Sequence, residues 1–137
     1  MTLSLQARII IGIMLITIPT VEFGGYFLLS RLKKQSGYSD NGVQGHYFRA
    51  GHAHAGVLLI LAMLAQIFVD GVHFADPLAY VVRVGFMLPP ILMPIGFFLG
   101  APGADGKPKA LVHLIPVGAL SLAFGTVVLG VGLVFGL

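Results

Sequence analysis

Two histidines and an arginine stand at the head of a long apolar run in this sequence. His52 and His54 follow closely behind Arg49, and the run after them, residues 57–69, contains a single polar residue, Gln66. Ionisable side chains are costly to place in a membrane, so those in membrane helices generally face a protein interior and mark a site. We therefore expect this stretch to be the functional centre of the chain.

The two histidines cannot act as neighbouring ligands of one metal ion if the stretch is helical. Side chains two residues apart on an α-helix point about 200° away from each other. His52 shares its face with Gln66, whereas the residues on the face of His54 are apolar. We expect one histidine to face the helix bundle, and the other to face a second protomer, a cofactor or a hydrogen-bond partner.

The composition is that of a membrane protein. Of the 137 residues, 57% are hydrophobic and 9% are charged, whereas a soluble domain carries about 25% charged residues. The chain has no cysteine, which excludes disulfides and thiolate ligands, and nothing in it indicates nucleic-acid binding. We expect an all-α, integral membrane four-helix bundle, a single domain in the lipid bilayer, with transmembrane helices at about residues 8–30, 48–69, 78–100 and 110–135.

The basic residues predict an orientation. Lysine and arginine are concentrated in two of the expected loops, residues 31–49 and 101–109, and basic loops generally stay on the cytoplasmic side. We therefore predict a multi-pass protein of the cell (inner) membrane with both termini outside the cytoplasm. In this arrangement His52, His54 and His113 lie near the cytoplasmic ends of their helices.

Imidazoles on two membrane helices suggest haem b. Its iron takes axial histidines from facing helices, and its flat ring fills an apolar slot lined by small residues. We expect His54 and His113 to be the axial ligands, with the haem between the second and fourth helices. Arg49 would pair with a propionate, and His52 would orient the site or bind on the opposite face.

Three other interpretations remain open from the residues. A zinc, copper or iron ion could be held by Glu22, His113 and one histidine of the second helix. A quinone pocket needs only a histidine and an acid to bond the quinone carbonyls. In a non-catalytic accessory subunit, the histidines would merely join helices by hydrogen bonds.

The run Arg49-Ala-Gly-His52-Ala-His54-Ala-Gly-Val-Leu-Leu resembles the second transmembrane helix of haem-copper oxidases and nitric oxide reductases. It is more similar to small oxidase-like membrane proteins with an Arg-x-x-His-x-His pattern. The resemblance covers about one helix in four. It implies that a histidine here is an axial ligand of haem b, and His54 matches that position best, with His52 as the alternative.

The resemblance does not extend to the oxidase reaction. The chain has too few helices for an oxidase subunit, and it lacks the His-Pro and His-His motifs that hold copper or non-haem iron. Oxygen or nitric oxide reduction is therefore not implied. The expected role is electron transfer, or gas or redox sensing.

Small residues in the last apolar segment predict close helix packing. Gly118, Gly125 and Gly132 recur at a spacing of seven residues, and such stripes let membrane helices approach closely. Because four helices enclose little interior, we expect a homodimer or larger homo-oligomer. A respiratory complex is a further candidate partner.

The orientation can be tested by labelling. In the Ser36→Cys variant, we expect the new thiol to resist an impermeant maleimide in intact cells and to react after permeabilisation, because residues 31–49 should be cytoplasmic. Ready labelling of intact cells would reverse the predicted orientation.

Overall fold

The computed structural model describes residues 2–33, 42–103 and 106–136, and these form helices with no strand. The elements are α1 (Leu5–Lys33), α2 (Val43–Asp70), α3 (Asp76–Met87), α4 (Pro89–Leu99), the short 3₁₀ helix η1 (Ala110–His113) and α5 (Leu114–Phe135). Within the described residues, four helical spans are long and apolar enough to cross a membrane, namely Leu5–Arg31, Val43–Asp70, Asp76–Leu99 and Ala110–Phe135. The all-α, four-helix, multi-pass membrane architecture predicted from the sequence is confirmed.

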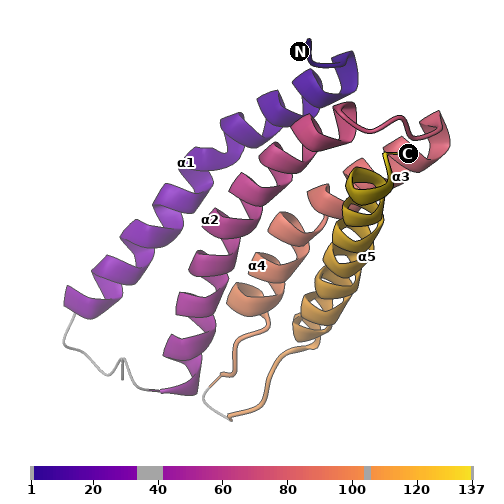
Figure 1. Ribbon diagram of the computed structural model, residues 1–137. Coiled ribbons are helices and arrows are strands. Elements are labelled where there is room, and N and C mark those ends of the chain that lie inside the picture. The colour runs from indigo at the N-terminus through magenta and orange to yellow at the C-terminus, as the bar shows by residue number, and fades with distance from the viewer. Residues whose placement is uncertain (1, 34–41, 104–105, 137) are drawn as a thin grey trace.

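The helix bounds differ from the expected ones mainly at the start of α2. This helix begins at Val43, five residues before the predicted start at Phe48, so the polar segment that contains His46 belongs to it. The proposed thiol-labelling position, Ser36, lies outside the described residues. Both ends of the described chain lie at the same end of the bundle (Figure 1), as an even number of spans requires.

The third span is broken where the sequence places two prolines. Pro89 has no N–H, so it cannot donate the helical hydrogen bond to the carbonyl of Gly85. The Ser121 hydroxyl of α5 donates to that carbonyl instead, at 3.1 Å. A polar side chain from a neighbouring helix thus satisfies a backbone group that lipid could not.

The helices lie side by side in the order α1, α2, α4, α5 (Figure 1). Among the described elements, α2 packs against α1, α3 and α4, whereas the extensive contacts of α1 are with α2 alone. The buried apolar core runs along one half of the bundle, from Leu59 to Val69 of α2, with Ile10, Met14, Val82, Phe86 and Leu129 around it. The histidines of α2 lie in the other, more open half.

The glycine stripe of the last helix is used inside the chain. An ideal Cβ on Gly118 would lie 2.6 Å from Met93 Cγ, and one on Gly132 would lie 2.4 Å from the Phe74 ring. A Cβ on Gly85 would lie 3.3 Å from the Gly125 Cα. The stripe therefore serves packing of α5 against α3, α4 and the loop that precedes α3.

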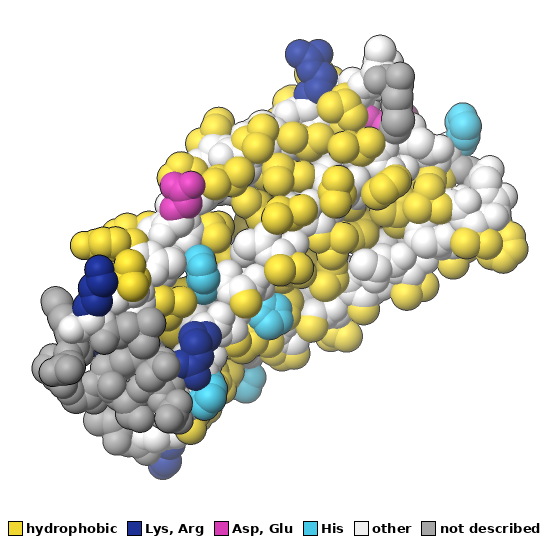
Figure 2. Space-filling view, turned by 60° about the vertical axis from the view of Figure 1, so that its left-hand side comes forward, with side chains coloured by type: hydrophobic (Ala, Val, Ile, Leu, Met, Phe, Trp, Pro, Cys, Tyr) yellow, Lys and Arg dark blue, Asp and Glu magenta, His cyan; other side chains and the backbone are white. Residues whose placement is uncertain are grey.

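The outer surface of the bundle is suited to lipid. Figure 2 shows hydrophobic side chains over most of one face, with lysine and arginine side chains towards its ends. Large apolar side chains are exposed on every long helix, for example Ile16, Val57, Ile91 and Leu120. Contact with the lipid bilayer follows from this surface.

A buried ion pair joins three helices at the end of the bundle that holds the N-terminus. Arg83 of α3 pairs with Asp70 of α2, and their side chains are 4% and 7% exposed. Arg83 also donates to the Gln66 carbonyl and side chain, both at 3.2 Å, and to the Ser4 hydroxyl at 3.3 Å. Asp70 accepts the Ser4 backbone N–H at 2.7 Å. The start of α1 is thereby held on α2 and α3.

The ion pair predicts a marked effect of removing one partner. Arg83→Ala leaves the Asp70 carboxylate buried without its cation, which costs about 3–5 kcal/mol. We expect a clearly lower melting temperature in detergent, followed by circular dichroism. Arg8→Ala, which removes an exposed arginine of α1, should change the melting temperature little. Equal shifts in the two variants would contradict a structural role for the pair.

Candidate functional site

The two histidines of α2 face different neighbours, as the helical spacing predicts. The His52 ring lies against Gly24 and Gly25 of α1. The His54 ring packs on Phe97 of α4, with ring centroids 4.9 Å apart. One face of α2 therefore offers an imidazole to α1, and another offers an imidazole to α4.

His52 packs closely on two glycines of α1. An ideal Cβ on Gly25 would lie 3.2 Å from Cε1 and 3.3 Å from Nε2 of the ring, and one on Gly24 would lie 3.4 Å from Nδ1. The Nδ1 atom of His52 is buried and has no hydrogen-bond partner among the described residues. A buried polar atom without a partner costs about 1–3 kcal/mol.

His54 has a defined tautomer. Its Nδ1 lies 2.7 Å from the carbonyl oxygen of Ala50, one turn earlier on α2. A carbonyl oxygen only accepts hydrogen bonds, so Nδ1 carries the proton and donates it. In the neutral ring, Nε2 then holds the lone pair. This is the arrangement that metal-ligating histidines generally have.

Arg49 lies one turn before the histidines, near the start of α2. Its guanidinium donates to Nδ1 of His46 at 3.0 Å. Arg49 is half-buried and His46 is exposed. The cation is thus close to the histidines along the helix, on the side of the basic loops.

The other predicted ligands do not join the α2 histidines in one chain. Glu22 is exposed on α1, and His113 is exposed on η1. One side of α4 contacts α2, since a Cβ on Gly51 would lie 2.9 Å from Phe97 and Phe98. The other side contacts η1 and α5, since a Cβ on Gly96 would lie 2.7 Å from Ile115. Hence α4 stands between His54 and His113.

The part of the chain that the structure describes contains no group of three histidine, cysteine or acidic side chains placed to hold a metal ion. The ion site with Glu22, His113 and an α2 histidine is therefore not assembled in this arrangement. The expected haem ligand pair, His54 and His113, is likewise not brought together within one chain.

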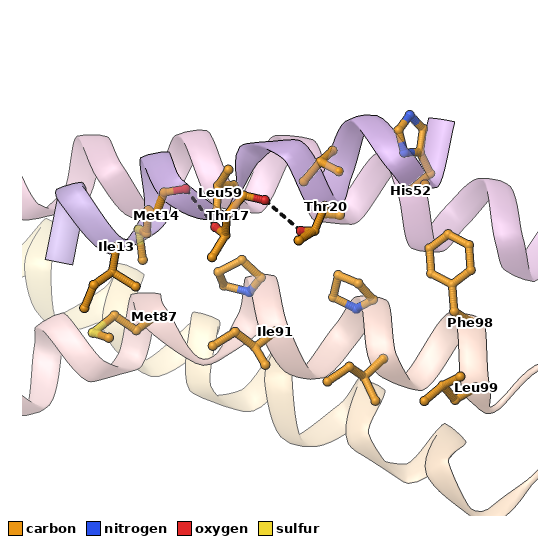
Figure 3. Close-up of a pocket in the computed structure, with 16 residues that line it drawn as sticks. Ile13, Met14, Thr17, Thr20, His52, Leu59, Met87, Ile91, Phe98 and Leu99 are labelled. Atoms are coloured by element: carbon orange, nitrogen blue, oxygen red, sulfur yellow. Dashed lines mark hydrogen bonds between the residues drawn. The ribbon is translucent and has the colours of Figure 1, made fainter. Parts of the chain in front are cut away.

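A groove of about 360 Å³ lies between α1, α2 and the α3–α4 span (Figure 3). It is lined by Ile13, Met14, Thr17, Thr20, Val21 and Gly24 of α1, by His52, Ala55 and Leu59 of α2, and by Met87, Pro90, Ile91, Pro94, Ile95, Phe98 and Leu99 of the broken span. Its volume is within the usual range for small-molecule sites. Apart from His52 and the two threonines, its walls are apolar.

Sequence reasoning missed this groove and the Arg83–Asp70 pair. The groove exists because α1 packs on α2 and leaves its side towards α4 uncovered, which no local pattern encodes. The ion pair had a weak signal, since Gln66, Asp70 and Arg83 are the polar residues of two otherwise apolar segments. No protein-family model, curated protein or solved structure matches this chain, so a functional assignment has to rest on the chemistry of these residues.

Proposed function

We propose that this membrane protein binds haem b, with Nε2 of His54 as an axial ligand, and acts in electron transfer or in gas or redox sensing. The observation that supports the proposal most is the hydrogen bond from His54 Nδ1 to the Ala50 carbonyl. It leaves the lone pair on Nε2, and it holds the ring in one orientation, as a backbone carbonyl does for metal-bound imidazoles.

The residues around His54 are of the types that haem b sites use. Phe97 supplies an aromatic wall, and Ala50 and Ala53 are small residues beside His54 on α2. Arg49 lies on the side of the predicted cytoplasmic loops, where a guanidinium can pair with a propionate. When bound, haem supplies one-electron redox chemistry or gas binding. The protein residues hold the ring and set its exposure to water.

The ligand in the second axial position of the iron would distinguish electron transfer from gas sensing. Because α4 separates His113 from His54, one chain offers a single imidazole to this face of α2. A single histidine leaves a position free for a gas. A second copy that contributes its own His54 would supply two imidazoles, as electron-transfer sites use. The predicted homo-oligomer therefore bears on the function and not only on stability.

The proposal is tested by an absorption spectrum of protein expressed with ample haem supply. Wild-type protein should show a Soret band, and His54→Ala should lose most of it because no other nitrogen replaces the ligand. Added imidazole should restore part of the band. His73→Ala, at the opposite end of the bundle, should leave it unchanged.

His113→Ala is the matched variant for the second ligand. With one imidazole supplied by each chain, it should leave the band position unchanged. A shift from low spin to high spin in this variant would instead restore the pair expected from the sequence. Wild-type protein with no Soret band would end the haem proposal in favour of an accessory role, in which His54 joins α2 to α4 through Phe97.

A further inference from the structure

Glu22 is a carboxylate on the lipid-facing side of a membrane span. It is exposed on α1, four residues from Ile18, the midpoint of the span Leu5–Arg31. At 1.5 Å per residue it lies about 6 Å from that midpoint, and the hydrocarbon core extends about 15 Å to either side of its centre. No hydrogen bond or ion pair of its side chain occurs among the described residues. An ionisable group at this depth requires a polar partner, and the described part of its own bundle supplies none.

His113 is the complementary group on the other side of the bundle. It is exposed on η1, which begins the span Ala110–Phe135, and no hydrogen bond of its imidazole occurs in residues 2–33, 42–103 and 106–136. An imidazole carries an N–H in either protonation state, and a carboxylate oxygen can accept it. His54 is the weaker candidate, because its Nδ1 is already bonded and its ring packs on Phe97.

Contacts between helices place Glu22 and His113 at similar depth. A Cβ on Gly24 of α1 would lie 3.9 Å from the Phe98 ring of α4. A Cβ on Gly100, two residues after Phe98, would lie 2.6 Å from the backbone of η1, which contains His113. The segment around Gly24 and η1 thus occupy one layer of the bundle, on either side of the end of α4. Glu22 is two residues from Gly24, or about 3 Å along α1, which the length of a side chain can bridge.

Within one chain the two side chains lie far apart, because α1 and α5 are the outermost helices of the row α1, α2, α4, α5 (Figure 1). Copies that insert in the same orientation are related by rotation about the membrane normal, which keeps every residue at its own depth. His113 of one copy can therefore meet Glu22 of another. Since α1 and α5 run in opposite directions across the bilayer, residues that precede Glu22 then lie opposite residues that follow His113.

We propose that the lipid-facing side of α1 docks on η1 and α5 of a second copy, with the Glu22 carboxylate hydrogen-bonded to the His113 imidazole. The remainder of the contact is apolar. Leu15 of α1 and Leu120 of α5, each two helical turns from the pair, are exposed and would face each other. The polar pair fixes the register, because any slip along the helices would leave both groups in lipid. The contact gives the predicted homo-oligomer a defined interface, and it does not depend on haem.

Association is measured on the full chain in phosphatidylcholine liposomes, prepared without haem. Copies carry donor or acceptor fluorophores on an added C-terminal tag, and energy transfer is followed as the protein is diluted in lipid. We expect wild-type protein to associate and to dissociate on dilution. Glu22→Leu and His113→Leu should each weaken association at least about threefold, the effect of one interhelical hydrogen bond of average strength. Wild-type protein that is monomeric at every dilution would overturn the proposal.

Combined substitutions test the pairing itself. Glu22→Leu together with His113→Leu should be no weaker than either single variant, because all three lack the same hydrogen bond. Glu22→His together with His113→Glu should restore association. Asp76→Leu and His73→Leu change exposed residues at the opposite end of the bundle and should leave association unchanged. An effect of Glu22→Leu without one of His113→Leu would overturn the proposal and give Glu22 a different partner, and so would an exchange that restores nothing.

Cross-linking tests the register with the polar pair intact. The chain has no cysteine, so introduced thiols react alone. Leu15→Cys in one copy and Leu120→Cys in another should form a disulfide on mild oxidation, which requires α-carbons within about 7 Å. Leu15→Cys with Val127→Cys, about 10 Å further along α5, should form none. Absence of the first disulfide, or equal yields of the two, would overturn the proposal.

Folding of each variant is checked by its helical circular dichroism. Leucine suits a lipid-facing position, and if a leucine variant nevertheless does not fold, the cross-linking result decides the question. Because no readout involves a Soret band, failure here and failure of the haem proposal are distinguishable.

Discussion

The close approach of α2 and α4 at Gly51 sets the environment of both histidines. A Cβ at this position would lie 2.9 Å from Phe97 and Phe98, so a larger residue would require these side chains or α4 to shift. With the helices in contact, His54 reaches the Phe97 ring and His52 is turned towards α1. The helical repeat points the two imidazoles in different directions, and the close approach at Gly51 brings α4 against one of them.

Most buried polar groups of this bundle have a hydrogen-bond or ion-pair partner, as groups out of reach of water require. The carbonyl freed by Pro89 is bonded by Ser121, and Asp70 is paired with Arg83. Among the described residues, only His52 Nδ1 and Arg83 Nε are buried side-chain atoms with no partner. The Arg83 nitrogen belongs to a guanidinium that is otherwise well bonded. The His52 nitrogen lies against Gly24 of α1 and has no such compensation among the described residues.

His52 and His54 use different faces of one helix. His52 and His54 differ by two residues, or about 3 Å along the helix axis, and α2 alone lies between the faces they occupy. The Arg83–Asp70 pair, at the other end, holds α1 on α2, and α1 forms one wall of the groove.

Composition and local pattern were sufficient for much of the fold. The number of spans and the opposite directions of His52 and His54 follow from hydropathy and the helical repeat, and the structure confirms both. The early start of α2 at Val43 was missed because Gln44, Gly45 and His46 are typical loop residues in sequence. The glycine stripe was recognised as a packing face, but not which helices it faces.

What the sequence by itself determined is therefore local: which segments cross the membrane, and which side chains share a helix face. Neighbour relations between helices were decided by tertiary packing. Only that packing placed α4 between His54 and His113, paired Arg83 with Asp70, and left α1 separated from α4 by a groove. The physical reason is that contacts between helices depend on the fit of whole surfaces, in which one glycine or one proline sets the distance of approach. The 3.6-residue repeat of one helix carries no information about which helix will pack against it.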